Sequence, residues 1–166
     1  MYKSHSEIIT PDRSHTIWRY MTLPKFLSLH NDRRLYFTRQ DKFLDLKEGK
    51  RSAPDLSLYD NAVPGISDII EKDPFGCAFL NCWTMSDVDS FLMWSSYSTL
   101  DKGIAIKSTI EHLINSLDLN DERWIFISDV KYIDYYDEYT FDKAGGIAND
   151  LARYFCKRMN FEQEKN

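Results

Sequence analysis

The sequence lacks the signatures of several common functional classes. Its three cysteines, Cys77, Cys82 and Cys156, form no Cys-x-x-Cys pair, and its four histidines show no metal-ligand spacing. No apolar run approaches the roughly 20 residues that span a bilayer, and the first residues lead into no apolar signal segment. We therefore expect no disulfide framework, no metal, no membrane partner, and reduced thiols in the cytoplasm.

Signatures of phosphate loops and of general nucleic-acid binding are also missing. The chain has no G-x-x-x-x-G-K-[ST] and no G-x-G-x-x-G string, which excludes the common nucleotide loops. Its formal net charge is −5, whereas general nucleic-acid binders show a basic excess. Residues 33–51 nevertheless hold seven Lys or Arg against three acids. This stretch is either a solvated surface or a basic rim beside a cleft for an anionic ligand.

What the chain does contain suits one folded domain over residues 1–166. It is 43% hydrophobic and 14% aromatic, enough for a core. Hydrophobic patterning predicts strands over residues 15–20, 34–38, 76–84, 103–107 and 124–135. The same patterning predicts helices over residues 23–30, 87–97, 109–117 and 143–159. Because strands and helices do not strictly alternate, we expect an α+β fold, with a mixed β-sheet and helices packed on it.

Two longer segments lead to specific expectations. Residues 143–159 have one apolar stripe at helical spacing, which includes Ile147, Leu151 and Phe155. This pattern predicts a helix. We expect the helix to pack on a sheet whose strands lie near Arg19, Cys82 and Ile106. Residues 41–74 are mostly polar and contain three prolines. They predict a long irregular loop beside the functional cleft, with a short helix at residues 66–71.

Several other side chains could carry chemistry. Cys82 lies in an apolar run and is expected to be a buried, inert thiol, because a cysteine nucleophile would need a nearby histidine. The aromatic residues Trp83, Trp94 and Tyr97 are expected to form core or cleft walls. Asp41, Asp45 and Glu48 could form a carboxylate cluster for a metal, although their spacing is not specific for one.

A series of short strings runs through most of the chain. In order, these are Trp18-Arg19-Tyr20-Met21, Leu35-Tyr36-Phe37, residues 41–49, Asn81-Cys82-Trp83, Met93-Trp94-Ser95-Ser96-Tyr97, residues 103–109, residues 130–135 and Phe161-Glu162-Gln163-Glu164. From about Ile17 to Glu164 this series is similar to the bacterial domain-of-unknown-function family 2971. That family has no established activity, so the resemblance implies no reaction.

The chain departs from this family at three places. The family usually has Ser-Cys-Trp where this chain has Asn81-Cys82-Trp83, and Asp-Pro-Phe-Glu-Gly where it has residues 45–49. The family also tends to continue past the Glu-x-Glu string, whereas this chain stops at Asn166. The chain is either a natural short form or one that lacks a C-terminal strand.

A more distant resemblance is to ADP-ribosyltransferase folds. These have an Arg or His on an early strand, a polar residue with an aromatic on a central strand, and a late Glu-x-Glu. The resemblance implies cofactor-binding roles for Arg19, Asn81, Trp83, Thr84 and Glu162, and a catalytic role for Glu164. Arginine can hold a pyrophosphate by bidentate bonds, and a carboxylate can stabilise the ribosyl cation as nicotinamide leaves. Asn81 departs from the Ser or Thr that such folds use.

Two functions therefore remain. The first is an ADP-ribosyltransferase-like or NAD-cleaving protein, for instance a toxin or defence effector, with NAD as co-substrate. The second is a non-enzymatic module that binds a nucleotide, nucleic acid or protein between the Arg19 and Asn81 strands. Under the first function Arg19, Asn81 and Glu164 should line one pocket, whereas under the second Glu164 can point anywhere.

Overall fold

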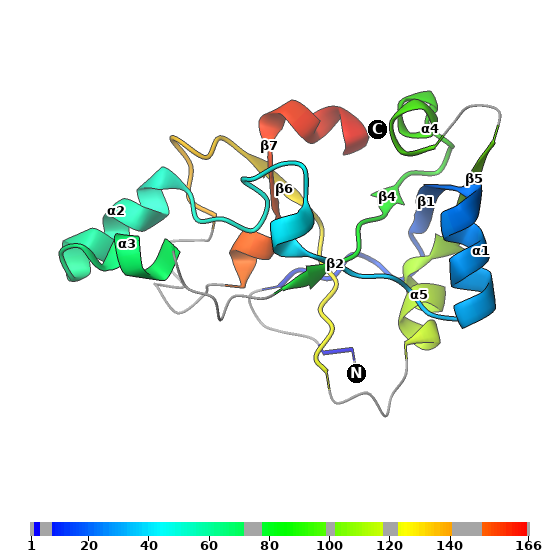
Figure 1. Ribbon diagram of the computed structural model, residues 1–166, viewed down its shortest axis with the longest axis horizontal. Coiled ribbons are helices and arrows are strands. Elements are labelled where there is room, and N and C mark those ends of the chain that lie inside the picture. Colours follow the sequence, from blue (N-terminus) through cyan, green and yellow to red (C-terminus); the bar gives the residue numbers. More distant parts are fainter. Residues whose placement is uncertain are drawn as a thin grey trace.

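A computed structural model describes residues 2–3, 8–71, 78–98, 102–117, 123–140 and 151–165 of the chain. Helices and short strands are interspersed along these residues and form small sheets (Figure 1). This arrangement confirms the predicted α+β class. Within the described ranges, no helix has both the length and the apolar character needed to cross a membrane.

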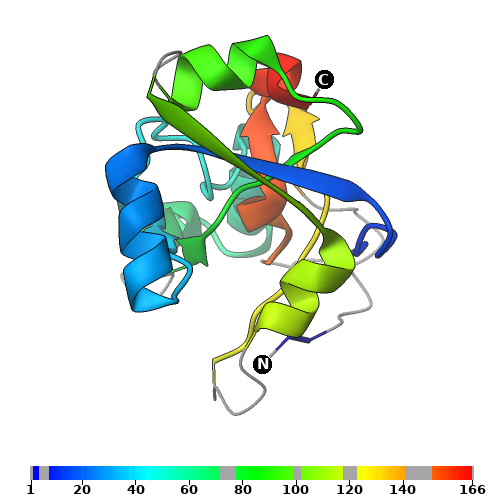
Figure 2. The same ribbon diagram turned by 90° about the vertical axis from the view of Figure 1, so that its right-hand side faces the viewer.

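The largest sheet has three antiparallel strands in the order β4-β1-β5. β1 (Thr16–Thr22) pairs along its whole length with β5 (Gly103–Thr109), so that Arg19 lies opposite Ile106 (Figure 2). β4 (Thr84–Met85) pairs with the other edge of β1. Because successive side chains of a strand point to opposite faces, Arg19 shares a face with Ile17 and not with Tyr20. The predicted strands at 15–20 and 103–107 are confirmed.

Helices pack around this sheet as the local sequence predicts. α1 (Leu23–Asp32) follows β1 directly and has proline in its first turn, a position that proline tolerates. α5 (Ile110–Ser116) begins after Thr109, whose hydroxyl oxygen accepts a hydrogen bond from the backbone N–H of His112 at 3.2 Å. α4 (Phe91–Tyr97) starts later than predicted, because Ser90 caps it.

The strands nearest Arg19, Cys82 and Ile106 share the sheet β4-β1-β5, as predicted, and the remaining described strands form two further small sheets. β2 (Thr38–Arg39) pairs with β3 (Phe79–Leu80), and β6 (Lys131–Ile133) pairs with β7 (Cys156–Arg158). The predicted strand at 76–84 is divided between β3 and β4, and Cys82 lies between them, outside both strands. Residues 124–135 form only β6 and one bridge from Ile125 to Tyr2.

The expected helix at 143–159 is wrong where the structure describes it. Residues 151–165 form the 3-10 helix η3 (Ala152–Phe155), then β7, then the 3-10 helix η4 (Met159–Lys165), and Ile147 lies outside the described residues. Parallel pairing of β7 with β6 buries Cys156 beside Ile133 and Tyr135. A non-local strand pair has thus overridden a helical pattern in the sequence.

The segment at 41–74 is more regular than predicted over the residues described. After η1 (Gln40–Lys42) it contains α2 (Ala53–Ala62) and α3 (Ile66–Glu71), of which only α3 was predicted. A capping box starts α2: Ser52 and Asp55 exchange hydrogen bonds, and Asp55 also accepts one from the hydroxyl of Thr140 at 2.7 Å. Ser52 and Asp55 are both fully buried. Polar contacts instead of an apolar stripe hold this helix in place, so hydrophobic periodicity could not reveal it.

Candidate functional site

Arg19 lies on β1 with its guanidinium close to two other predicted site residues. Its Nη2 donates a hydrogen bond to the carbonyl oxygen of Tyr36 at 3.2 Å, and its Cζ lies 5.7 Å from the centre of the Trp83 ring. No carboxylate among the described residues forms an ion pair with Arg19. Burial lowers the pKa of Arg19, with an opposing effect from Cys82, but arginine remains a cation. The group is therefore a half-buried positive charge without a counter-ion in the described part of the chain.

Asn81 holds Trp83 in place beneath Arg19. Its Nδ2 donates to the carbonyl oxygen of Tyr36 at 2.8 Å, and its Oδ1 accepts from Nε1 of Trp83 at 2.7 Å. Arg19 and Asn81 thus share one carbonyl acceptor. The structure brings Arg19, Asn81 and Trp83 together as expected, although both ends of the Asn81 amide are used in the scaffold.

Two predicted residues are not part of this group. Thr84 is buried in β4, where it pairs with Trp18, so its side chain is not available to a ligand. Glu162 is exposed on η4, and it makes no hydrogen bond or ion pair with any other residue in the described ranges. Among the described residues, neither side chain forms a hydrogen bond or an ion pair with Arg19.

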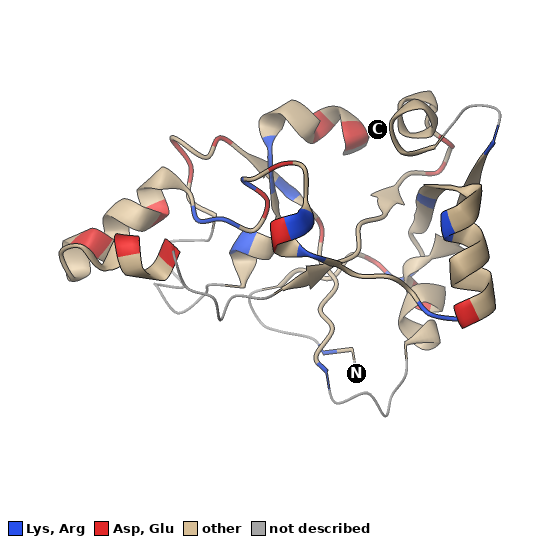
Figure 3. Ribbon diagram, viewed as in Figure 1, with Lys and Arg blue, Asp and Glu red and all other residues tan. Residues whose placement is uncertain are grey.

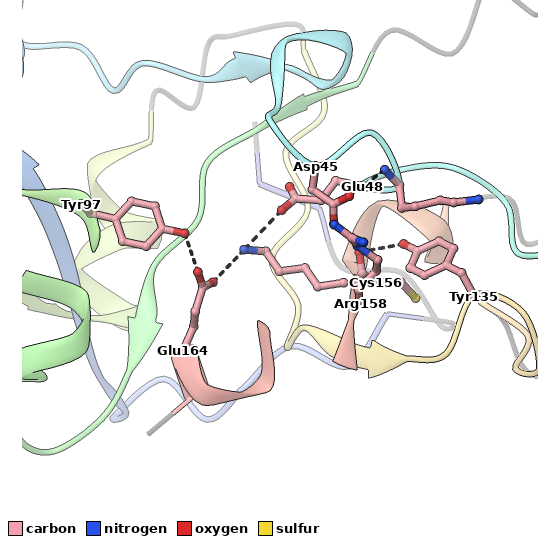
Figure 4. A network of polar contacts seen from close by, with 9 residues as sticks. Asp45, Glu48, Tyr97, Tyr135, Cys156, Arg158 and Glu164 are labelled. Atoms are coloured by element: carbon pink, nitrogen blue, oxygen red, sulfur yellow. Dashed lines mark hydrogen bonds and ion pairs between the residues drawn. The ribbon is translucent and has the colours of Figure 1, made fainter. Parts of the chain in front are cut away.

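Glu164, the predicted catalytic residue, lies in a second polar cluster. The Tyr97 hydroxyl donates to its Oε1 at 2.6 Å, and the Lys157 ammonium donates to its Oε2 at 3.0 Å (Figure 4). We call Tyr97, Lys157 and Glu164 the carboxylate clamp. Lys157 also lies 3.4 Å from Oε1 of Glu48. The side chains of Lys157, Glu48 and Glu164 are only 10%, 8% and 16% exposed.

The protonation states of this cluster follow from burial and from the neighbouring charges. Burial alone would lower the pKa of Lys157, but the ionised form of the Cys82 thiol and the Glu48 and Glu164 carboxylates raise it above its ordinary value. Burial raises the pKa of Tyr97, as does its bond to Glu164, so the hydroxyl keeps its proton at neutral pH. Burial also raises the pKa of Glu48, against the attraction of Lys157. When both carboxylates are ionised, one ammonium is shared by two negative charges.

Cys82 connects the two groups electrostatically. Burial raises the pKa of this thiol, Lys157 and Arg19 lower it, and Glu48 and Glu164 raise it. Arg19 and Glu164 are thus both within electrostatic range of Cys82. Cys82 is an exposed residue, so the expectation of a buried cysteine is wrong. Desolvation by the surrounding protein is nevertheless the largest influence on the pKa of its thiol, and it raises that pKa.

The possible metal cluster of Asp41, Asp45 and Glu48 is not formed. Asp41 pairs with Arg39, Asp45 with Arg158 at 2.9 Å, and Glu48 with Lys157. Figure 3 accordingly shows positive and negative residues mixed along the chain between α1 and α2. The described residues contain no group of three His, Cys, Asp or Glu that could hold a metal ion.

A small cavity lies behind Asn81 and Trp83. It has a volume of about 40 Å³ and is otherwise lined by Leu35, Phe37, Leu113, Leu117, Ile125, Phe126 and Ile127. Pockets for small-molecule ligands typically measure roughly 300–1,000 Å³. The cavity is thus too small for a nucleobase, and a nucleotide at this site would have to lie over Arg19 and Trp83 instead.

Sequence reasoning missed Lys157 and the pairing of Glu48. Lys157 was placed in a helix, and no motif marks a lysine that meets a glutamate from the segment at 41–74. Comparison of the chain with protein-family models, with curated proteins and with solved structures gives no match. The two resemblances therefore stay predictions, and a function has to be argued from the geometry around Arg19 and Glu164.

Proposed function

We propose that the chain binds a nucleotide that carries both phosphate and a positively charged ring, with NAD as the first candidate. The observation that carries this proposal is the half-buried Arg19, which has no carboxylate partner among the described residues. Burying an unpaired cation is costly, and a bound anion would remove that cost. A guanidinium matches the oxygens of a phosphate with a planar set of donors.

The carboxylates near Cys82 support a ligand with a positive charge at its other end. Glu48 and Glu164 share the single ammonium of Lys157, which leaves an excess negative charge when both are ionised. NAD combines a negatively charged pyrophosphate with a positively charged nicotinamide ring. Because β4, which directly follows Trp83, contacts η4, which carries Glu164, one extended ligand could reach both groups.

Within this proposal Glu164 is the catalytic residue of an ADP-ribosyl transfer or of NAD cleavage. Its carboxylate would stabilise the positive charge that develops on the ribose as nicotinamide leaves. Tyr97 and Lys157 each donate one bond to a different oxygen of Glu164. Since a carboxylate oxygen has two acceptor sites, each oxygen keeps one for the ligand.

A second candidate function is a non-enzymatic nucleotide-binding module. The observation in its favour is that both oxygens of Glu164 already have donors, as in an ion pair that only holds the fold together. Under this function Arg19 and Trp83 still bind the ligand, but no bond of the ligand is broken.

Calorimetry with NAD, together with chromatography for released nicotinamide, tests both candidates. Arg19→Ala should weaken binding, whereas the control Arg34→Ala, an exposed arginine outside the site, should not. Binding with nicotinamide release supports the enzyme, and binding without release supports the module. Absence of both at millimolar NAD contradicts the proposal.

A further inference from the structure

The carboxylate clamp joins α4 to β7 and η4, two consecutive elements that lie far from α4 in the sequence. Tyr97 is the last residue of α4, Lys157 is the middle residue of β7, and Glu164 belongs to η4. Figure 4 shows the Tyr97 hydroxyl directed at the Glu164 carboxylate. We propose that Tyr97 and Lys157 are positioning residues that hold Glu164 in the orientation needed for ADP-ribosyl transfer. This inference rests on the proposed function.

The backbone of η4 is a poor support for a catalytic carboxylate by itself. It is a 3-10 helix of seven residues, and the hydrogen-bond geometry of 3-10 helices is weaker than that of α-helices. A glutamate also has several rotatable side-chain bonds. Donors at 2.6 Å and 3.0 Å on the two oxygens fix the carboxylate plane, and hydrogen bonds to charged groups are among the strongest in proteins.

Lys157 is itself held from several sides. Its backbone pairs with Tyr132 of β6, and its ammonium lies 3.4 Å from Glu48 and 5.6 Å from the centre of the Phe161 ring on η4. Its position is therefore defined without any ligand. An ammonium fixed in this way can hold Glu164 before the ligand arrives, as preorganisation requires.

The geometry separates binding from chemistry. Arg19 and Trp83 form the group that meets the phosphates, whereas Tyr97 donates a hydrogen bond to Glu164. Loss of the Tyr97 hydroxyl, which carries no charge, should thus lower kcat and leave KM and NAD affinity nearly unchanged. A misplacement of about 1 Å in a reacting group can cost roughly 100-fold in rate.

Tyr97→Phe is the cleanest test, because it keeps the ring and every charge and removes one hydroxyl. We expect kcat for nicotinamide release to fall about tenfold or more, with an unchanged Kd for NAD. Tyr136→Phe is the matched control, since Tyr136 is exposed and lies outside the clamp. Lys157→Arg should retain more activity than Lys157→Met, which also leaves Glu48 unpaired and could unfold the chain.

A double-mutant cycle distinguishes positioning from a general effect on the fold. If Tyr97 acts through Glu164, adding Tyr97→Phe to Glu164→Gln should lower kcat no further. An unchanged kcat in Tyr97→Phe, or additive losses in the double mutant, contradicts the proposal that Tyr97 positions Glu164. Neither result contradicts the proposed function. A wild-type protein that releases no nicotinamide overturns the clamp and the proposed enzyme together.

Discussion

The hydroxyl of Tyr97 lies 2.6 Å from Oε1 of Glu164, although 67 positions separate the two residues in the chain. This bond ties the end of α4 to η4. Lys157, on the other oxygen of Glu164, extends the connection to β7 and to Glu48. Glu164, the proposed catalytic residue, therefore also links α4 to β7 and η4. Experiments on Glu164 must measure folding as well as activity.

The buried Asp55 should be the most sensitive polar position of α2. It accepts hydrogen bonds from Ser52 and Thr140 and is fully buried. Asp55→Ala leaves those donors unsatisfied, at about 1–3 kcal/mol for each buried group, whereas Ser52→Ala should cost about 0.5–2 kcal/mol. Urea unfolding measures both. Ser57→Ala, on the exposed side of α2, is the control, and a loss from it as large as from Asp55→Ala would contradict this account.

Glu48 should make the protein less stable as the pH rises. Burial raises its pKa in the folded state, so the folded chain binds its proton more tightly than the unfolded chain does. Its contribution is then fully present below its ordinary pKa of about 4.3 and is lost as the pH rises through the raised pKa of the folded state. Urea unfolding from about pH 4 to about pH 7 should show this decline in the wild type and a smaller one in Glu48→Gln. A wild type that gains stability relative to Glu48→Gln over that range would show that Lys157 outweighs burial.

Cys82 should react with iodoacetamide before Cys156. Cys82 is exposed, whereas Cys156 is buried, and burial raises the pKa of Cys156 to about 12. Since the thiolate is the reactive form, the rate at Cys82 should increase with pH, and Cys156 should react only on unfolding. Peptide mapping by mass spectrometry separates the two sites. Equal labelling of both cysteines in the folded protein would be inconsistent with the structure.

Arg19→Lys should weaken NAD binding even though it keeps the charge. Lysine has no planar set of donors and does not stack on an indole as a guanidinium does, whereas Arg19 contacts both the Tyr36 carbonyl and the Trp83 ring. We expect a loss of about tenfold or more in affinity by calorimetry. A variant that binds as tightly as the wild type would mean that Arg19 supplies only a positive charge.

The parts of the fold that were predicted correctly have local causes. β1 and β5 show short-range strand patterning, and α5 begins at Thr109, whose side chain caps it. The incorrect prediction of a helix over residues 151–159, the described part of 143–159, has a non-local cause, because β7 forms through its pairing with β6. The hydrophobic periodicity of β6 or of β7 does not indicate that these two distant segments pair with each other.

The same distinction applies to the candidate site. The resemblance implied one site with Arg19, Asn81, Trp83 and Glu164; hydrogen bonds and a ring contact join the first three, whereas Glu164 bonds to Tyr97 and Lys157. Lys157 and Glu48 could not be predicted as partners, because nothing local in the sequence marks a buried ion pair between β7 and the segment at 41–74. Thr84 and Glu162 were assigned by motif position alone. Thr84 is buried and pairs with Trp18, the residue before Arg19, whereas Glu162 is exposed on η4.

The most direct test of the proposed function is the rate of nicotinamide release from NAD by the wild type, Glu164→Gln and Glu162→Gln. The two glutamates lie two positions apart on η4. Of the two, only Glu164 accepts hydrogen bonds from Tyr97 and Lys157 in the described structure. The account predicts release by the wild type and by Glu162→Gln, and a rate about 10²–10³-fold lower for Glu164→Gln, with all three proteins folded. No release by the wild type, or equal rates for the two variants, would contradict it.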